Sequence, residues 1–84
     1  MAHGLALENL PASVLYDVFQ DAVAVLTGQY LQQERDASDP AVAASWWTKT
    51  LDLRATARSI DPDDRAGLVE HTRRWRREAA DLNP

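Results

Sequence analysis

The chain has 84 residues, with 9 basic and 13 acidic side chains and a formal net charge of −4 at pH 7. This length fits one small domain, and because such a chain buries only about 60–65% of its unfolded surface, a single copy is expected to be marginally stable. The lack of cysteine excludes disulfides, thiol nucleophiles and cysteine-ligated zinc sites. No apolar run approaches the roughly 18 residues of a membrane span and no signal-peptide pattern opens the chain, so we expect a cytoplasmic protein without membrane contact.

Two aspartate–proline pairs, Asp39–Pro40 and Asp61–Pro62, indicate where helices begin. An aspartate before a helix accepts hydrogen bonds from the free amide groups of the first turn, and a proline at the first helical position has no amide proton to leave unpaired. We therefore predict helices over residues 40–60 and 62–82.

A further helix is predicted over residues 11–36, beginning near Pro11, with Asn9 or Ser13 as its cap. Its apolar side chains cover a continuous arc of roughly 200°, which is wide enough to contact at least two neighbouring elements. The residues of this arc are Val14, Leu15, Tyr16, Val18, Phe19, Ala22, Val23, Val25, Leu26 and Tyr30. Gly28 lies on the narrow polar stripe, where two explanations stay open: close packing against another helix, or a local bend.

The other two predicted helices each carry one apolar seam with alternating three- and four-residue spacing, which is the pattern of helices in a bundle. The seam of the second helix is Ala43, Trp46, Thr50, Leu53, Ala57 and Ile60. The seam of the third helix is Leu68, Thr72, Trp75, Ala79 and Leu82. No segment shows the two-residue alternation of a half-buried strand.

The predicted fold class is therefore all-α, and the whole chain, 1–84, is expected to be one small domain. In this three-helix bundle the helices 40–60 and 62–82 form an antiparallel hairpin, and the long first helix packs across it. Residues 1–9 are expected to be frayed. The alternative is one short turn that packs on the bundle through leucines, which are Leu5, Leu7 and Leu10.

The sequence predicts no catalytic or metal centre. The two histidines, His3 and His71, lack a second ligand at a useful helical spacing. The acidic cluster of Asp61, Asp63 and Asp64 lacks the glycine and the glutamate of a calcium-binding loop, and it is expected to cap a helix. We therefore expect no enzymatic activity, no metal and no cofactor.

Four arginines, Arg73, Arg74, Arg76 and Arg77, lie close together in the last predicted helix. Acidic residues lie four positions from several of them, which is typical of a solvated helix face with ion pairs between successive turns. A DNA-binding surface normally presents a basic footprint with side chains that contact bases. Nucleic acid is therefore only the alternative ligand of this helix.

One stripe of the helix 40–60 has the composition of a protein interface. It consists of Trp47, Leu51, Arg54 and Arg58, at successive spacings of four, three and four residues. Tryptophan and arginine are enriched among the residues that dominate binding between proteins, where they fill pockets and form forked hydrogen bonds. The alternative is that the tryptophan widens the core against the first helix, with the arginine stems covering its edge.

These patterns favour a non-catalytic protein-interaction module that self-associates. We expect a two-fold homodimer with the first helix near the axis, because the apolar arc is wide and a chain this small gains from burying more surface. An accessory or regulatory protein of a mobile element or of a toxin–antitoxin pair is the expected biological setting, with a protein partner. The alternative is a dimeric DNA-binding regulator that uses the four arginines of the last helix.

Overall fold

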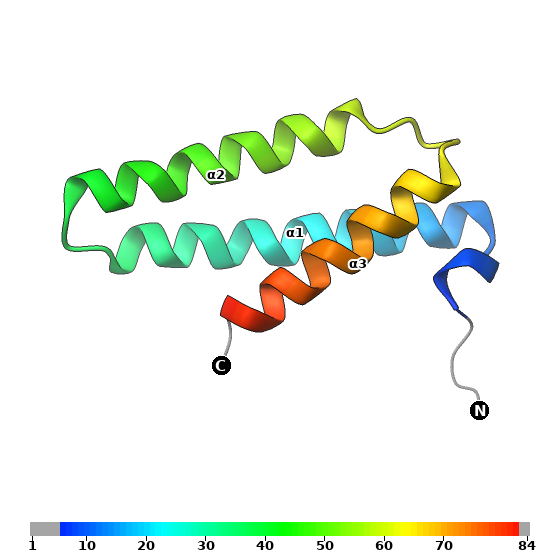
Figure 1. Ribbon diagram of the computed structural model, residues 1–84, viewed down its shortest axis with the longest axis horizontal. Helices are drawn as coiled ribbons and strands as arrows, with labels where there is room; N and C mark the ends of the chain where they lie inside the picture. The colour runs from blue at the N-terminus through cyan, green and yellow to red at the C-terminus, as the bar shows by residue number, and fades with distance from the viewer. Residues whose placement is uncertain (1–5, 83–84) are drawn as a thin grey trace.

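The computed structural model describes residues 6–82, which form three long helices and one short turn (Figure 1). The 3₁₀ turn η1 (Leu7–Asn9) precedes the helices, which are α1 (Ala12–Asp36), α2 (Pro40–Ser59) and α3 (Arg65–Leu82). No strand occurs within residues 6–82, so the predicted all-α class is confirmed.

α1 is the central helix of the bundle. α2 returns alongside α1 in the opposite direction, and α3 crosses α1 obliquely on the nearer side in Figure 1. α2 and α3 run in opposite directions, as predicted, but the close packing expected between them is found instead between each of them and α1. The reason is the width of the apolar surface: α1 presents an arc with room for two neighbours, whereas α2 and α3 each carry one narrow seam.

The starts of the first two helices follow different rules. At α2, a carboxylate oxygen of Asp39 accepts a hydrogen bond of 2.9 Å from the amide two residues later, and Pro40 is the first helical residue, as predicted. At α1, Pro11 occupies the cap position and no side chain of residues 6–82 caps the helix, so the predicted caps Asn9 and Ser13 are wrong. The first of these lies in η1, and the second lies already inside the helix.

α3 begins at Arg65 rather than at residue 62, because the preceding aspartates form a turn of their own. The Asp61 carboxylate accepts a hydrogen bond from the Asp63 amide at 2.8 Å, and the Asp61 carbonyl accepts one from the Asp64 amide at 2.9 Å. Such local bonds compete with helix formation. The Asp64 carboxylate then accepts from the Gly67 amide at 3.0 Å. The helix cap expected from the acidic cluster is therefore present, three residues later than predicted.

The core lies between α1 and the two helices that flank it. Its buried residues are Leu15, Phe19, Ala22, Leu26 and Tyr30 of α1, Thr50 and Leu53 of α2, and Leu68, Val69, Thr72, Trp75 and Ala79 of α3. Every residue of the two predicted seams is buried or half-buried, so both seams are confirmed. The ring centroids of Phe19 and Trp75 lie 5.6 Å apart, between α1 and α3, and those of Tyr30 and Trp46 lie 5.8 Å apart, between α1 and α2.

Part of the apolar arc of α1 stays outside this core. Val14 is 42% exposed and Val25 is 48% exposed, so α2 and α3 cover only part of this arc. Gly28 also faces open space, since among the described residues no side chain or neighbouring element lies within 4 Å of the position that a Cβ would occupy. Close packing therefore does not explain this glycine.

The turn η1 packs on the bundle beside α3. Leu7 and Leu10 are half-buried against the core. Arg65 donates hydrogen bonds from Nη1 to the carbonyl of Glu8 at 3.0 Å and to that of Leu10 at 2.7 Å. Over these residues the chain forms the short turn that was the alternative to fraying, and Leu5 lies outside the described residues.

Candidate interaction surfaces

The stripe predicted as a protein interface lies on an exposed side of α2. Trp47 is 44% exposed and Leu51 is 47% exposed, and the exposed Arg54 and Arg58 continue the stripe toward the end of the helix. The alternative in which Trp47 widens the core does not fit this exposure. The core-facing tryptophan of the adjacent pair is Trp46, which is half-buried.

The stripe points away from α3. On its other side, α2 shares the lining of a small cavity with Arg74 and Trp75 of α3, and the lining residues from α2 are Lys49, Asp52, Leu53 and Thr56. At 100° per residue these positions lie on roughly the opposite side of α2 from Trp47 and Leu51. The stripe therefore belongs to the side of the α1–α2 hairpin that α3 leaves uncovered, and we call it the uncovered side.

A groove of about 470 Å³ runs between α1 and α2 and includes part of the stripe. Arg54 and Arg58 line it from α2, and Tyr16, Gln20 and Val23 line it from α1. The Gln20 amide donates a hydrogen bond of 2.6 Å to the Tyr16 hydroxyl, which fixes both side chains on the α1 wall. The Tyr16 ring and the arginine stems give the groove an apolar lining that suits an apolar side chain of a partner. The guanidinium groups at its edge suit a carboxylate beside that side chain.

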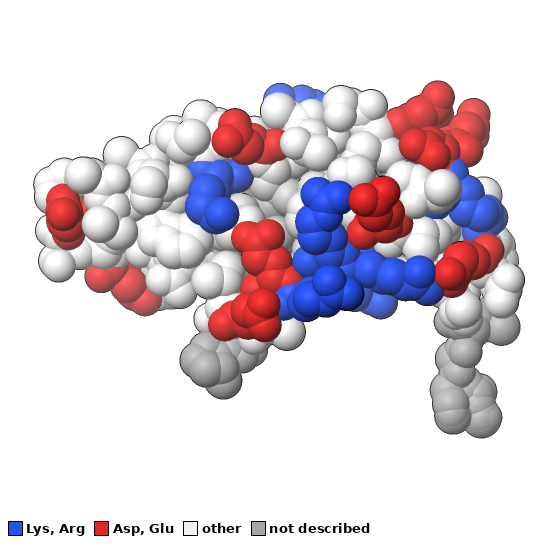
Figure 2. Space-filling model, in the orientation of Figure 1, with Lys and Arg blue, Asp and Glu red and all other residues white. Residues whose placement is uncertain are grey.

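The four arginines of α3 lie on its exposed side, where basic side chains gather between acidic ones (Figure 2). Arg73 donates to the Glu8 carboxylate of η1 at 2.7 Å, and Arg74 donates to the Glu70 carboxylate at 2.9 Å. The other two arginines form no hydrogen bond or ion pair within residues 6–82. Two of the four predicted nucleic-acid contacts are therefore bound to carboxylates of the protein itself.

A second contact between η1 and α3 is the ion pair of Glu8 with Arg73. The hydrogen bond from Arg73 holds the pKa of the Glu8 carboxyl below its ordinary value. Because the two side chains are 49% and 53% exposed, solvent screens the pair and its contribution to stability is small. Its effect is positional, since it ties the N-terminal turn to the middle of α3.

One polar cluster joins all three helices. The Tyr30 hydroxyl of α1 donates a hydrogen bond to the Glu78 carboxylate of α3, and Lys49 of α2 lies 3.8 Å from the same carboxylate. Burial and the bond to Glu78 raise the pKa of the Tyr30 phenol. Because these groups are paired with one another, the cluster is suited to holding the helices together.

Neither the histidines nor the carboxylates form a metal centre in the part of the chain that the structure describes. Nδ1 of the half-buried His71 lies 2.9 Å from the Gly67 carbonyl, so this histidine is engaged within its own helix. His3 lies outside the described residues. Within residues 6–82, none of the helices combines the length and the apolar content that a membrane span requires.

Comparison of the chain with protein-family models, curated proteins and solved structures finds no match. The candidate surfaces therefore rest on the geometry of this chain alone.

Two contacts that organise these surfaces join residues far apart in the sequence, and they are Arg73–Glu8 and Tyr30–Glu78. Helical periodicity carries no signal for either contact. The available signal is chemical, because a phenol within an apolar arc needs a hydrogen-bond partner from a neighbouring helix.

Proposed function

We propose that this chain is a non-catalytic protein-interaction module that self-associates through the uncovered side of the α1–α2 hairpin. The observation that carries the proposal is the exposure of Trp47 and Leu51 on that side, next to the groove that Arg54 and Arg58 line. Removing such apolar surface from water drives association, and arginines at the edge add hydrogen bonds of defined direction.

A second copy of the chain suits this surface, because groups of opposite charge lie at its two ends. Arg54 and Arg58 lie toward the end of α2. Glu34 lies toward the end of α1, about five helical turns after Tyr16 and so on the same side of the helix. A two-fold axis perpendicular to the hairpin would bring the arginine end of one copy to the acidic end of the other, with Trp47 between them.

The thin shape of the molecule also supports this arrangement. The Cα atoms extend over 44 × 29 × 14 Å, and the short dimension equals about two packed helices at the usual separation of roughly 8–10 Å. α3 supplies one layer and the α1–α2 hairpin supplies the other. In a dimer joined through the hairpins, the α1 and α2 helices of both copies would form the two central layers. Each hairpin would then have α3 on one side and the hairpin of the other copy on the other side.

Sedimentation equilibrium at tens of micromolar tests the proposal. The native chain should have twice its chain mass of 9.4 kDa. The double variant Trp47→Ala, Arg54→Glu should have the mass of one chain and keep its helical circular-dichroism spectrum, since both residues lie outside the core. A native chain that sediments at 9.4 kDa would contradict self-association, and a double variant that still dimerises would contradict the assigned surface.

Two matched controls separate this surface from general effects of substitution. Val42 is also on α2 and is 44% exposed, but it lies outside the stripe, so Val42→Ala should leave the mass unchanged. Arg76 lies on α3, and Arg76→Glu makes the same charge change as Arg54→Glu on another face. The melting temperature of each variant is compared at equal chain concentration, because dimer dissociation by itself lowers it.

The proposed setting is the cytoplasm, as an accessory or regulatory protein of a mobile element or a toxin–antitoxin pair. The dimeric DNA-binding regulator is the competing function, and a salt titration distinguishes the two. Binding to duplex DNA that weakens steeply with salt would support the regulator. We favour the protein-interaction module, because the carboxylates of Glu8 and Glu70 lie against Arg73 and Arg74 and would repel a phosphate backbone that runs along these arginines.

A further inference from the structure

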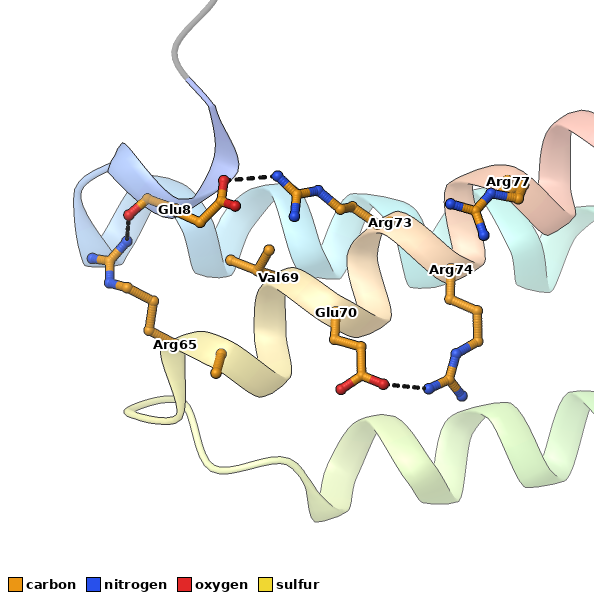
Figure 3. Close-up of a pocket in the computed structure, with 8 residues that line it drawn as sticks. Glu8, Arg65, Val69, Glu70, Arg73, Arg74 and Arg77 are labelled. Atoms are coloured by element: carbon orange, nitrogen blue, oxygen red, sulfur yellow. Dashed lines mark hydrogen bonds and ion pairs between the residues drawn. The ribbon is translucent and has the colours of Figure 1, made fainter.

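A second groove lies on the α3 side of the molecule, away from the proposed self-association surface (Figure 3). It has a volume of about 790 Å³ and follows the exposed side of α3 from Arg65 to Arg77. This distance corresponds to roughly 18 Å of helix. Glu8 of η1 borders the groove near the start of α3. The volume falls within the range of sites that bind ligands.

The base of this groove is apolar. The exposed Ala66 supplies most of this apolar strip, and about one turn further on Val69, a core residue that is 6% exposed, reaches the lining. A helix alone presents a convex surface, and the concavity here needs η1 beside α3. The hydrogen bonds from Arg65 to the carbonyls of Glu8 and Leu10 hold that turn in place.

The rim of the groove is basic. Four of its lining residues are arginines and two are glutamates, so it is locally positive on a chain whose net charge is −4. Arg73 and Arg74 each donate to one carboxylate, and because a guanidinium carries five N–H groups, each keeps donors for a ligand. Arg77, one turn beyond Arg73, forms no hydrogen bond or ion pair within residues 6–82.

We propose that this groove binds an acidic segment of a partner protein. One apolar side chain of the segment would lie on Ala66 and Val69, and its carboxylates would accept hydrogen bonds from Arg74 and Arg77. The ion pairs of Arg73 and Arg74 hold these guanidiniums at the rim before binding, which reduces the entropy lost when the ligand arrives. This site is separate from the self-association surface and does not depend on it.

A protein segment fits this groove better than a nucleic acid does. A phosphate backbone carries regular negative charge, and it would bring phosphates past the carboxylates of Glu8 and Glu70 as well as past the arginines. A peptide can place its carboxylates only where guanidiniums face it. The apolar base also offers no partner to a phosphate, whereas it offers contact to a leucine or a similar side chain.

The test is an NMR titration of the full ¹⁵N-labelled chain with a short amphipathic peptide that carries leucines on one face and glutamates on the other. We expect saturable shifts centred on the amides of Ala66, Val69, Arg73 and Arg77. The same peptide with glutamine in place of glutamate should bind at least about tenfold more weakly, because charge-assisted hydrogen bonds are lost. No saturable shift with the acidic peptide, or equal affinity for both peptides, would overturn the proposal.

Two variants place the binding in the groove. Arg74→Gln with Arg77→Gln should weaken peptide binding at least about tenfold, since both proposed carboxylate contacts are lost. Ala66→Glu should do the same by adding negative charge to the base of the groove. This substitution is at an exposed position in the first turn of α3, where a carboxylate favours the helix, so the fold is retained.

The matched control is Arg54→Gln with Arg58→Gln, which removes two exposed arginines from the other side of the molecule. It should leave peptide binding unchanged even where it disrupts the dimer. Equal loss of binding in this control and in the groove variant would overturn the proposal. So would a short DNA duplex that shifts the same amides at lower concentration than the acidic peptide. Dimer mass, measured on the same samples, reports separately on self-association.

Discussion

Tyr30 and Glu78, which are 48 residues apart in the sequence, are joined by a hydrogen bond from the phenol of α1 to the carboxylate of α3. Lys49 of α2 lies 3.8 Å from the same carboxylate, and its ammonium group is 5.3 Å from the centre of the Tyr30 ring. This cluster therefore links the three helices at one place. It matters for the fold because α2 and α3 pack closely against α1 rather than against each other.

Replacing Tyr30 by phenylalanine should destabilise the protein by about 1.5–3 kcal/mol, the usual contribution of a hydrogen bond to a charged partner. The substitution keeps the buried ring and removes only the hydroxyl, so Glu78 loses its donor from α1. Urea denaturation measures the change. Tyr16→Phe is the matched control, because within the described part of the chain its hydroxyl bonds only to the exposed Gln20, and it should change stability by less than about 0.5 kcal/mol. Equal losses in the two variants would contradict a special role for Tyr30.

The same phenol should make stability sensitive to alkaline pH. Burial and the bond to Glu78 raise the pKa of Tyr30 above its ordinary value of 10.0. Above that pH the unfolded chain loses the phenol proton while the folded chain keeps it. The contribution of the Tyr30 phenol to the free energy of unfolding is therefore fully present below pH 10. As the pH rises further, this contribution is lost progressively, by up to about 1.4 kcal/mol per pH unit. Urea midpoints measured across this range should fall more steeply for the native chain than for Tyr30→Phe, and parallel curves would refute the assignment.

The sequence predicts the helices well, because local chemistry decides them. The Asp39–Pro40 start and the seams through Leu53 and Trp75 follow from capping and from helical periodicity, and the structure confirms all three. The start of α3 could not be predicted, because the Asp61 carboxylate can accept a hydrogen bond from a following amide either as a helix cap or within a turn. Asp64 is a second possible cap three residues later, and the structure uses it.

The surfaces were predicted less completely. The stripe of α2 is exposed where the sequence expected a contact surface, and its role as an interface stays a prediction. The groove along α3 needs η1 beside it, and the bonds that hold η1 span more than fifty residues, from Glu8 to Arg65 and Arg73. No pattern within one helix carries that information, since the arginines alone are equally consistent with a solvated face.

Gly28 offers a stabilising substitution. The position is helical and faces open space, so alanine adds no clash and improves helix propensity by about 1 kcal/mol. Gly28→Ala should raise the urea midpoint by the corresponding amount. Gly67→Ala is the contrasting change, because its Cβ would collide with the Asp64 carboxylate that caps α3. It should be neutral or destabilising, and a gain in both variants would show that propensity alone decides these positions.

Arg65→Ala should release η1 without unfolding the three helices. The guanidinium donates two hydrogen bonds to carbonyls of this segment, and the remaining polar tie is the solvent-screened pair of Glu8 with Arg73. Hydrogen exchange at the amides of Asn9 and Leu10, which bond within the turn, should become about tenfold faster, as expected for losing roughly 1.4 kcal/mol of local stability.

Amides in the middle of α1 are the control for Arg65→Ala, and they should keep their native rates because their exchange depends on opening of the core. Faster exchange throughout the chain would mean that Arg65 supports the whole fold, and unchanged exchange in η1 would mean that packing of its leucines is sufficient to hold the turn on α3.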